Sequence, residues 1–81
     1  MTTLNHKQLE ERIFVNVLRA ARNPENIMAD GEINWCFVDS DAYIDTLAMY
    51  SSSEQEFVRD NFYALFDGVC FAVDRALEKS A

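Results

Sequence analysis

The chain has 81 residues, which is enough for one domain, and we expect that domain to cover residues 1–81. Its composition is 49% apolar with only two glycines and one proline, which argues against a disordered or linker-like chain. The net charge of −7 disfavours direct binding to nucleic acid or to an anionic membrane, because an acidic surface cannot neutralise phosphates.

The first element that the sequence predicts is an amphipathic helix over residues 5–22. Apolar side chains recur along one face at helical spacing: Leu9, Ile13, Val17 and Ala20. Thr3 or Asn5 is the candidate N-cap, and Pro24 ends the helix because the residue before a proline is pushed out of the helical region. The outer face carries a mixture of charged and apolar side chains: Glu11, Arg12, Val15 and Arg19.

The segment from residue 26 to 38 has two interpretations. Asp30-Gly31 lies between apolar runs, as in a β-hairpin, and the second run is rich in aromatic and β-branched residues. A short apolar run is equally compatible with buried helix, and an isolated hairpin is only marginally stable in water. We favour helix or irregular structure here and keep a short β-hairpin as the alternative.

Two further helices are predicted after this segment. Asp39 or Ser40 caps a short helix from Asp41 to about Tyr50. Ser53 followed three residues later by a glutamate is a capping box, and it opens a long helix over residues 54–79. The fold class is therefore mainly α, a small helical bundle of three to four helices.

The long C-terminal helix has three distinct faces. Its core-facing stripe is apolar: Val58, Phe62, Leu65, Phe66, Val69, Ala72, Val73 and Ala76, with Leu77 at the edge. The opposite side carries a row of carboxylates with one tyrosine among them: Glu56, Asp60, Tyr63, Asp67, Asp74 and Glu78. Between them lies a third strip: Phe57, Ala64, Gly68 and Phe71.

These two exposed faces give the candidate binding residues. Like charges at i, i+4 cost a helix a few tenths of a kcal/mol, so the carboxylate row favours a partner-binding surface, with Phe71 at its border. The third strip is a candidate self-association surface. Gly68 costs the helix interior about 1 kcal/mol relative to alanine, which a closely packed neighbour would explain.

Acidic residues also dominate the middle of the chain, where residues 23–58 contain no lysine or arginine. The eight acids of this stretch are Glu25, Asp30, Glu32, Asp39, Asp41, Asp45, Glu54 and Glu56. Such a charge distribution suits a basic partner, although acids also serve solubility alone.

Residue patterns for catalysis and for metal or cofactor binding are missing from the sequence. Asp39-Ser40-Asp41 after an apolar run resembles the opening motif of haloacid-dehalogenase-type phosphotransferases, but that family needs a parallel sheet larger than this chain can build. One histidine, His6, and two distant cysteines give no zinc spacing, and the aspartates do not fit a calcium loop. We therefore expect no enzyme activity, no cofactor and no metal.

The cellular setting is also predicted from composition. No apolar run reaches the roughly 18–20 residues of a membrane span, and the first residues do not resemble a signal peptide. Cys36 and Cys70 lie in apolar runs, as reduced and structural cysteines do. We expect a soluble cytoplasmic protein that does not bind membranes.

The sequence thus favours a non-catalytic protein that acts through protein–protein interaction. Very small, acidic, helical chains with few cysteines resemble in type the accessory proteins of bacteriophages, including inhibitors of host functions and DNA mimics, and this resemblance implies action in a host cytoplasm. The expected partner is a basic protein surface, such as a nucleic-acid-binding site. Strict DNA mimicry requires the acids of residues 25–56 to gather beside the carboxylate row, because that row alone carries one charge per roughly 7 Å against one per about 1.7 Å in duplex DNA. The alternative is a self-associating helical assembly module, active as a homodimer.

Overall fold

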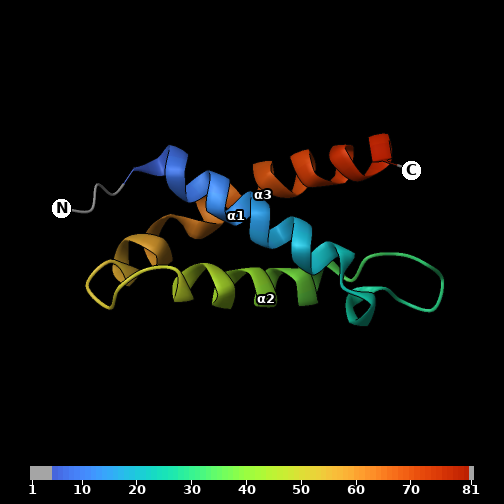
Figure 1. Ribbon diagram of the computed structural model, residues 1–81, viewed down its shortest axis with the longest axis horizontal. Coiled ribbons are helices and arrows are strands. Elements are labelled where there is room, and N and C mark those ends of the chain that lie inside the picture. Colours follow the sequence, from blue (N-terminus) through green and yellow to red (C-terminus); the bar gives the residue numbers. More distant parts are fainter. Residues whose placement is uncertain (1–4, 81) are drawn as a thin grey trace.

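The computed structural model describes residues 5–80, and these form three α-helices joined by short connections (Figure 1). The elements are α1 (His6–Arg22), a 3-10 turn η1 (Pro24–Asn26), α2 (Trp35–Ala48) and α3 (Gln55–Ser80). Helix α1 crosses the molecule and packs against both other helices, which contact one another much less (Figure 1). The predicted mainly helical fold is confirmed, in a compact arrangement of 44 × 22 × 18 Å.

Helix α1 agrees closely with the prediction. Asn5 is the N-cap, and its Oδ1 accepts a hydrogen bond of 2.7 Å from the backbone N–H of Gln8. Thr3, the other candidate cap, lies outside the described residues. The helix ends at Arg22, and Asn23 and Pro24 turn the chain into η1.

In the segment after η1, a single β-bridge is present where the sequence allows a short β-hairpin as the alternative. Ile27 and Ile33 form an isolated antiparallel bridge, which is the β pairing found within residues 5–80. Gly31 has a φ of +87°, a left-handed conformation that glycine adopts without strain. A turn closed by one bridge replaces a true hairpin, and the aromatic run after it is helical.

Helix α2 begins six residues before the predicted start, and this corrects the assignment of its cap. Asn34 is the N-cap, with Oδ1 3.4 Å from the backbone nitrogen of Phe37, so Asp39 and Ser40 lie inside the helix. The reason is burial. Val38 is completely buried one turn before Ala42, and a helix starting at Asp41 would lose that contact with the core.

The serine that caps the start of helix α3 also differs from the one predicted. The carboxylate of Glu54 accepts hydrogen bonds from the backbone N–H of Ser51 at 3.0 Å and from its hydroxyl at 2.8 Å. The cap therefore involves Ser51 and Glu54, two residues before the predicted pair of Ser53 and Glu56. A turn over residues 51–54 precedes the first α-helical residue, Gln55.

The core lies where α1 crosses the other helices. Its completely buried apolar side chains come from all three helices: Leu9, Ile13, Val17, Val38, Ala42, Val58, Phe62 and Val73. Leu65 is only partly buried and Ala72 is exposed, contrary to the prediction for α3. These two residues lie on the edge of the stripe, and α1 and α2 together cover less of α3 than the full stripe.

One polar pair lies inside this core. Asn16 of α1 donates a hydrogen bond of 3.0 Å through Nδ2 to the hydroxyl of Thr46 of α2, and both side chains are buried. At the other end of these helices, Asn26 Nδ2 donates to the Ala20 carbonyl at 2.9 Å and to Asp41 Oδ2 at 3.0 Å. These bonds fix α2 against α1.

Within residues 5–80, every helix is too short or too polar to cross a bilayer.

Candidate functional site

The candidate site is the line along which α2 lies beside α3. Trp35, Asp39 and Tyr43 are spaced four residues apart, so they share one side of α2. The opposing residues of α3 are Tyr63, Asp67, Cys70, Phe71 and Asp74. We call these eight residues the α2/α3 seam. The two helices run in opposite directions there, so Trp35 lies near Phe71 while Tyr43 lies near Tyr63.

A shallow hollow of about 340 Å³ opens at one end of the seam. It is lined by the indole of α2 and by four residues of α3: Trp35, Asp67, Cys70, Phe71 and Asp74. Phe71 is 65% exposed although it is a large apolar side chain. The guanidinium carbon of Arg75 lies 5.7 Å from the centre of the Phe71 ring. The hollow therefore combines aromatic surface, two exposed carboxylates and a ring that already accepts a guanidinium group.

Aromatic rings fill the other end of the seam. The ring of Tyr63 stacks on that of Tyr43 with centroids 5.8 Å apart, and it meets Phe62 edge-on at 5.1 Å. Desolvation raises the pKa of Tyr63, and the negative charge of Asp39 beside the phenol raises it further. This phenol is neutral at physiological pH, and its ring supplies an aromatic contact.

The single sulfur of the seam is unsuited to nucleophilic chemistry. Burial raises the pKa of the Cys70 thiol to about 11, and the negative charges of Asp67 and Asp39 contribute to the rise. A thiol with this pKa is almost entirely protonated near neutral pH, whereas the thiolate is the reactive form. Cys70 therefore contributes a small apolar contact to the hollow.

The structure brings together four of the seven residues predicted to bind a partner. Asp67, Phe71 and Asp74 line the hollow, and Tyr63 adjoins it in the seam. Glu56, Asp60 and Glu78 are exposed on α3 but do not line the hollow. The candidate surface is thus shorter than the full carboxylate row and includes residues of a second helix.

Four residues of the seam were not predicted to bind a partner, namely Trp35, Asp39, Tyr43 and Cys70. Trp35 lies in the segment over residues 26–38 whose structure the sequence left open, and Asp39 was assigned as a helix cap. Asp39 is partly buried, and its Oδ1 has no hydrogen-bond partner among the described residues. The spacing of Trp35, Asp39 and Tyr43 was the available signal, because it places them on one face as soon as the segment is assigned as helix.

The residues of the predicted self-association strip do not form one continuous surface, because they lie in different environments. Phe57 packs against the core, and its ring lies 5.4 Å from that of His6. Gly68 lines a groove between α1 and α3, whereas Phe71 lines the hollow beside α2. A Cβ atom on Gly68 would meet nothing within 4 Å among residues 5–80, so none of the described helices packs closely against it.

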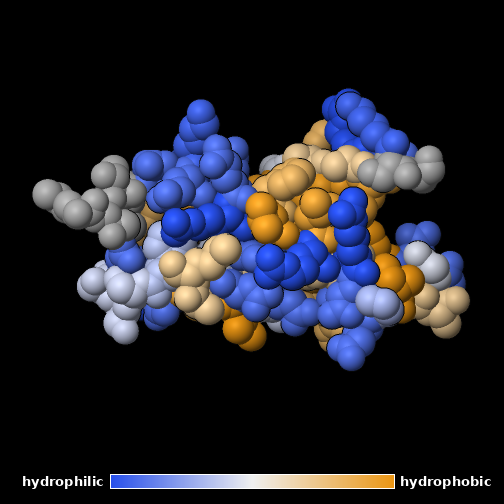
Figure 2. All heavy atoms as spheres, viewed as in Figure 1, coloured by the Kyte–Doolittle hydropathy of each residue, from blue (hydrophilic) through white to orange (hydrophobic). Residues whose placement is uncertain are grey.

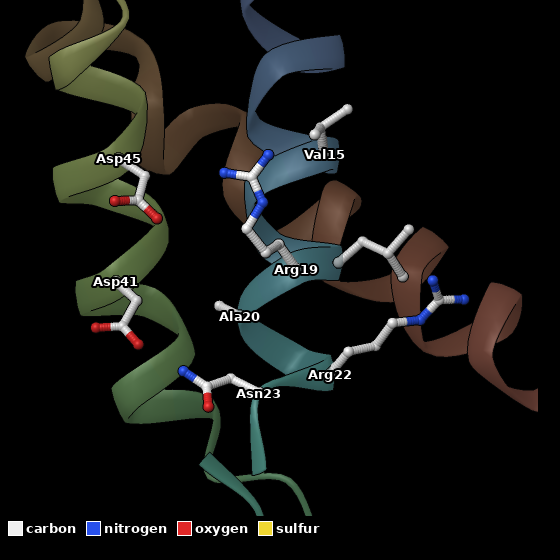
Figure 3. A pocket seen from close by; sticks show the side chains of 8 residues that line it. Val15, Arg19, Ala20, Arg22, Asn23, Asp41 and Asp45 are labelled. Carbon is white, nitrogen blue, oxygen red and sulfur yellow. The ribbon is translucent and has the colours of Figure 1, made fainter. Parts of the chain in front are cut away.

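A second hollow, of about 520 Å³, lies between α1 and α2 and carries both signs of charge. Figure 3 shows Asp41 and Asp45 on α2 facing Arg19 on α1, while Arg22 extends away from α2. These two aspartates therefore lie apart from Asp67 and Asp74. Strict DNA mimicry needed the acids of the middle segment to gather beside the carboxylate row, and Asp41 and Asp45 do not meet that condition.

The Asp-x-Asp pattern lies within a helix and not at the end of a strand. Asp39 and Asp41 lie in the interior of α2, where Asp39 adjoins Tyr63 and Asp41 accepts the hydrogen bond from Asn26. In the described part of the chain, no three histidine, cysteine, aspartate or glutamate side chains converge as metal ligands would. The phosphotransferase motif requires a strand end, which residues 35–48 do not supply.

Comparisons of this chain with protein-family models, with curated proteins and with solved structures found no match. A helical bundle by itself specifies no activity. Function is therefore inferred from the chemistry of the α2/α3 seam.

Proposed function

We propose that this chain is a small acidic, non-catalytic protein that binds the basic surface of another macromolecule through the α2/α3 seam. One observation carries the proposal. Exposed Phe71 and partly exposed Trp35 share a hollow with the carboxylates of Asp67 and Asp74. Action on a host protein in the cytoplasm, in the manner of phage accessory or inhibitor proteins, is the biological setting that we propose.

The chemistry of the hollow favours an arginine-rich partner. Aromatic side chains and arginine are enriched in the energetically dominant parts of protein interfaces. A guanidinium group can stack on Phe71 or Trp35 and at the same time donate paired hydrogen bonds to Asp67 or Asp74. Arg75 already lies 5.7 Å from the Phe71 ring within this chain, which supports the first of these contacts.

The test is a comparison of proteins captured from bacterial lysate by two charge-matched variants. Asp67→Lys combined with Asp74→Lys reverses the charge of the hollow. Glu25→Lys combined with Glu32→Lys changes the net charge by the same amount at exposed positions outside the seam. We expect at least one protein to bind the parent and the second variant but not the first. Its capture should also weaken between about 50 mM and 500 mM salt, because screening shortens the range of exposed charges.

Two results would contradict the proposal. Equal capture of every bound protein by both variants would mean that net charge, and not the hollow, is responsible. Capture that does not change with salt would exclude the electrostatic mechanism. Circular dichroism of each variant checks the fold, which exposed charges affect little.

A further inference from the structure

The outer face of α1 carries a charge pattern that is complementary to itself. Glu11, Val15, Leu18 and Arg22 follow the i, i+4, i+7, i+11 spacing and lie on one stripe of the helix. Glu11 and Arg22 are exposed, Val15 is 47% exposed, and Leu18 is partly buried. The stripe is thus acidic at one end, apolar in the middle and basic at the other end.

An apolar groove of about 480 Å³ runs beside this stripe, between α1 and α3. It is lined mainly by apolar or small residues, with two glutamates at one end: Glu10, Glu11, Phe14, Val15, Gly68, Val69 and Ala72. Gly68 and Ala72 are exposed, and the space above Gly68 is open. Figure 2 shows apolar surface between α1 and the C-terminal half of α3, where the two helices diverge in Figure 1.

The distribution of charge indicates which molecule can occupy the groove between α1 and α3. Helix α1 carries four cations, Lys7, Arg12, Arg19 and Arg22, against two acids, whereas the chain as a whole has a net charge of −7. Two copies of so acidic a chain repel one another unless they approach through their least acidic face. The face of α1 meets that condition, and it leaves the α2/α3 seam directed outward.

We infer that this chain forms a two-fold symmetric dimer in which the α1 helices pack antiparallel, each in the groove between α1 and α3 of the other copy. In that register Glu11 faces Arg22 of the second copy, and Val15 faces Leu18. Symmetry repeats each contact, so two ion pairs flank an apolar centre. This inference does not depend on the proposed function, because it uses the opposite side of α3.

Charge reversal tests both the dimer and its orientation. The molar mass of the parent, measured by sedimentation equilibrium between about 1 µM and 1 mM, should rise from 9.3 kDa toward twice that value. Glu11→Arg or Arg22→Glu alone should each weaken the dimer by roughly tenfold or more, because like charges then meet at both ends of the interface. A mixture of these two variants should dimerise, and so should the chain that carries both changes.

Val15→Asp tests the apolar centre and should also abolish the dimer. Its matched control is Ile44→Asp, because Ile44 is a β-branched residue that is 63% exposed on α2 and lies outside the groove. Circular dichroism checks that each variant is folded. A parent that stays monomeric over the whole range overturns the inference. So does a mixture of the two charge variants that fails to restore the dimer, or an equal effect of Val15→Asp and Ile44→Asp.

Discussion

At the scale of single residues, Phe62 is the centre of the core. It is completely buried, and the centroid of its ring lies 5.0 Å from that of the Tyr43 ring and 5.2 Å from that of the Phe66 ring. Phe62→Ala should lower the free energy of unfolding by about 3–5 kcal/mol, because it leaves a large cavity. Leu65→Ala should cost about half as much or less, since Leu65 is only partly buried. Urea unfolding of both variants measures the difference. Equal losses of unfolding free energy would contradict the assignment of Phe62 to the buried face of α3 and of Leu65 to its edge.

The raised pKa of Cys70 makes the free energy of unfolding decrease in the alkaline range. The pKa is about 11 in the folded chain against an ordinary value of 9.0. Below pH 9 the thiol is protonated in both states, so its contribution to stability is complete. Above pH 9 the unfolded chain releases the proton first, and stability falls as the pH rises through 11.

Urea unfolding at several values between pH 8 and about pH 11 should show this loss of stability. The Cys70→Ala variant should lose less over the same range. Its remaining loss includes the contribution of Tyr63, whose pKa is also raised. Identical pH profiles for the parent and Cys70→Ala would contradict the assignment of the shift to Cys70.

At the scale of elements, α1 was predictable because its signals are local. Asn5 caps it, Pro24 follows its end, and its apolar residues repeat without interruption. The start of α2 was not predictable in the same way, because residues 33–38 have no period that distinguishes strand from helix. Burial of Val38 beneath α1 decides the matter, and that contact exists only in the assembled fold.

The three consecutive serines before α3 give a test of its true start. Ser51→Ala should lower the free energy of unfolding by about 0.5–1.5 kcal/mol, because it removes the hydroxyl that donates a hydrogen bond of 2.8 Å to the Glu54 carboxylate, while the backbone N–H bond remains. Ser53→Ala is the matched control and should cost less, since the predicted pairing with Glu56 does not form. Thermal or urea unfolding measures both changes. A larger cost for Ser53→Ala would return the cap to the position that the sequence suggested.

At the scale of the whole molecule, the distribution of charge determines which surfaces can meet a partner. The sequence located the carboxylate row on α3 because helical periodicity fixes the angular positions of Asp67 and Asp74. It could not show that Trp35 and Asp39 lie beside them, since that proximity depends on the antiparallel packing of α2 on α3. Nor could it show that Asp41 and Asp45 face α1. The composition of the seam is a property of the tertiary fold.

The central claim, that a basic partner binds at the α2/α3 seam, is tested most directly by the fluorescence of Trp35. This residue is the only tryptophan in the chain, and it lines the hollow with Asp67 and Asp74. A captured partner is titrated into the parent, and the same titration of the Trp35→Phe variant subtracts the partner's own signal. We predict that Trp35 emission moves to shorter wavelength as the partner binds, and that Asp67→Lys with Asp74→Lys abolishes both the shift and the binding. Binding that leaves the emission of Trp35 unchanged, or that persists in the double lysine variant, would contradict the claim.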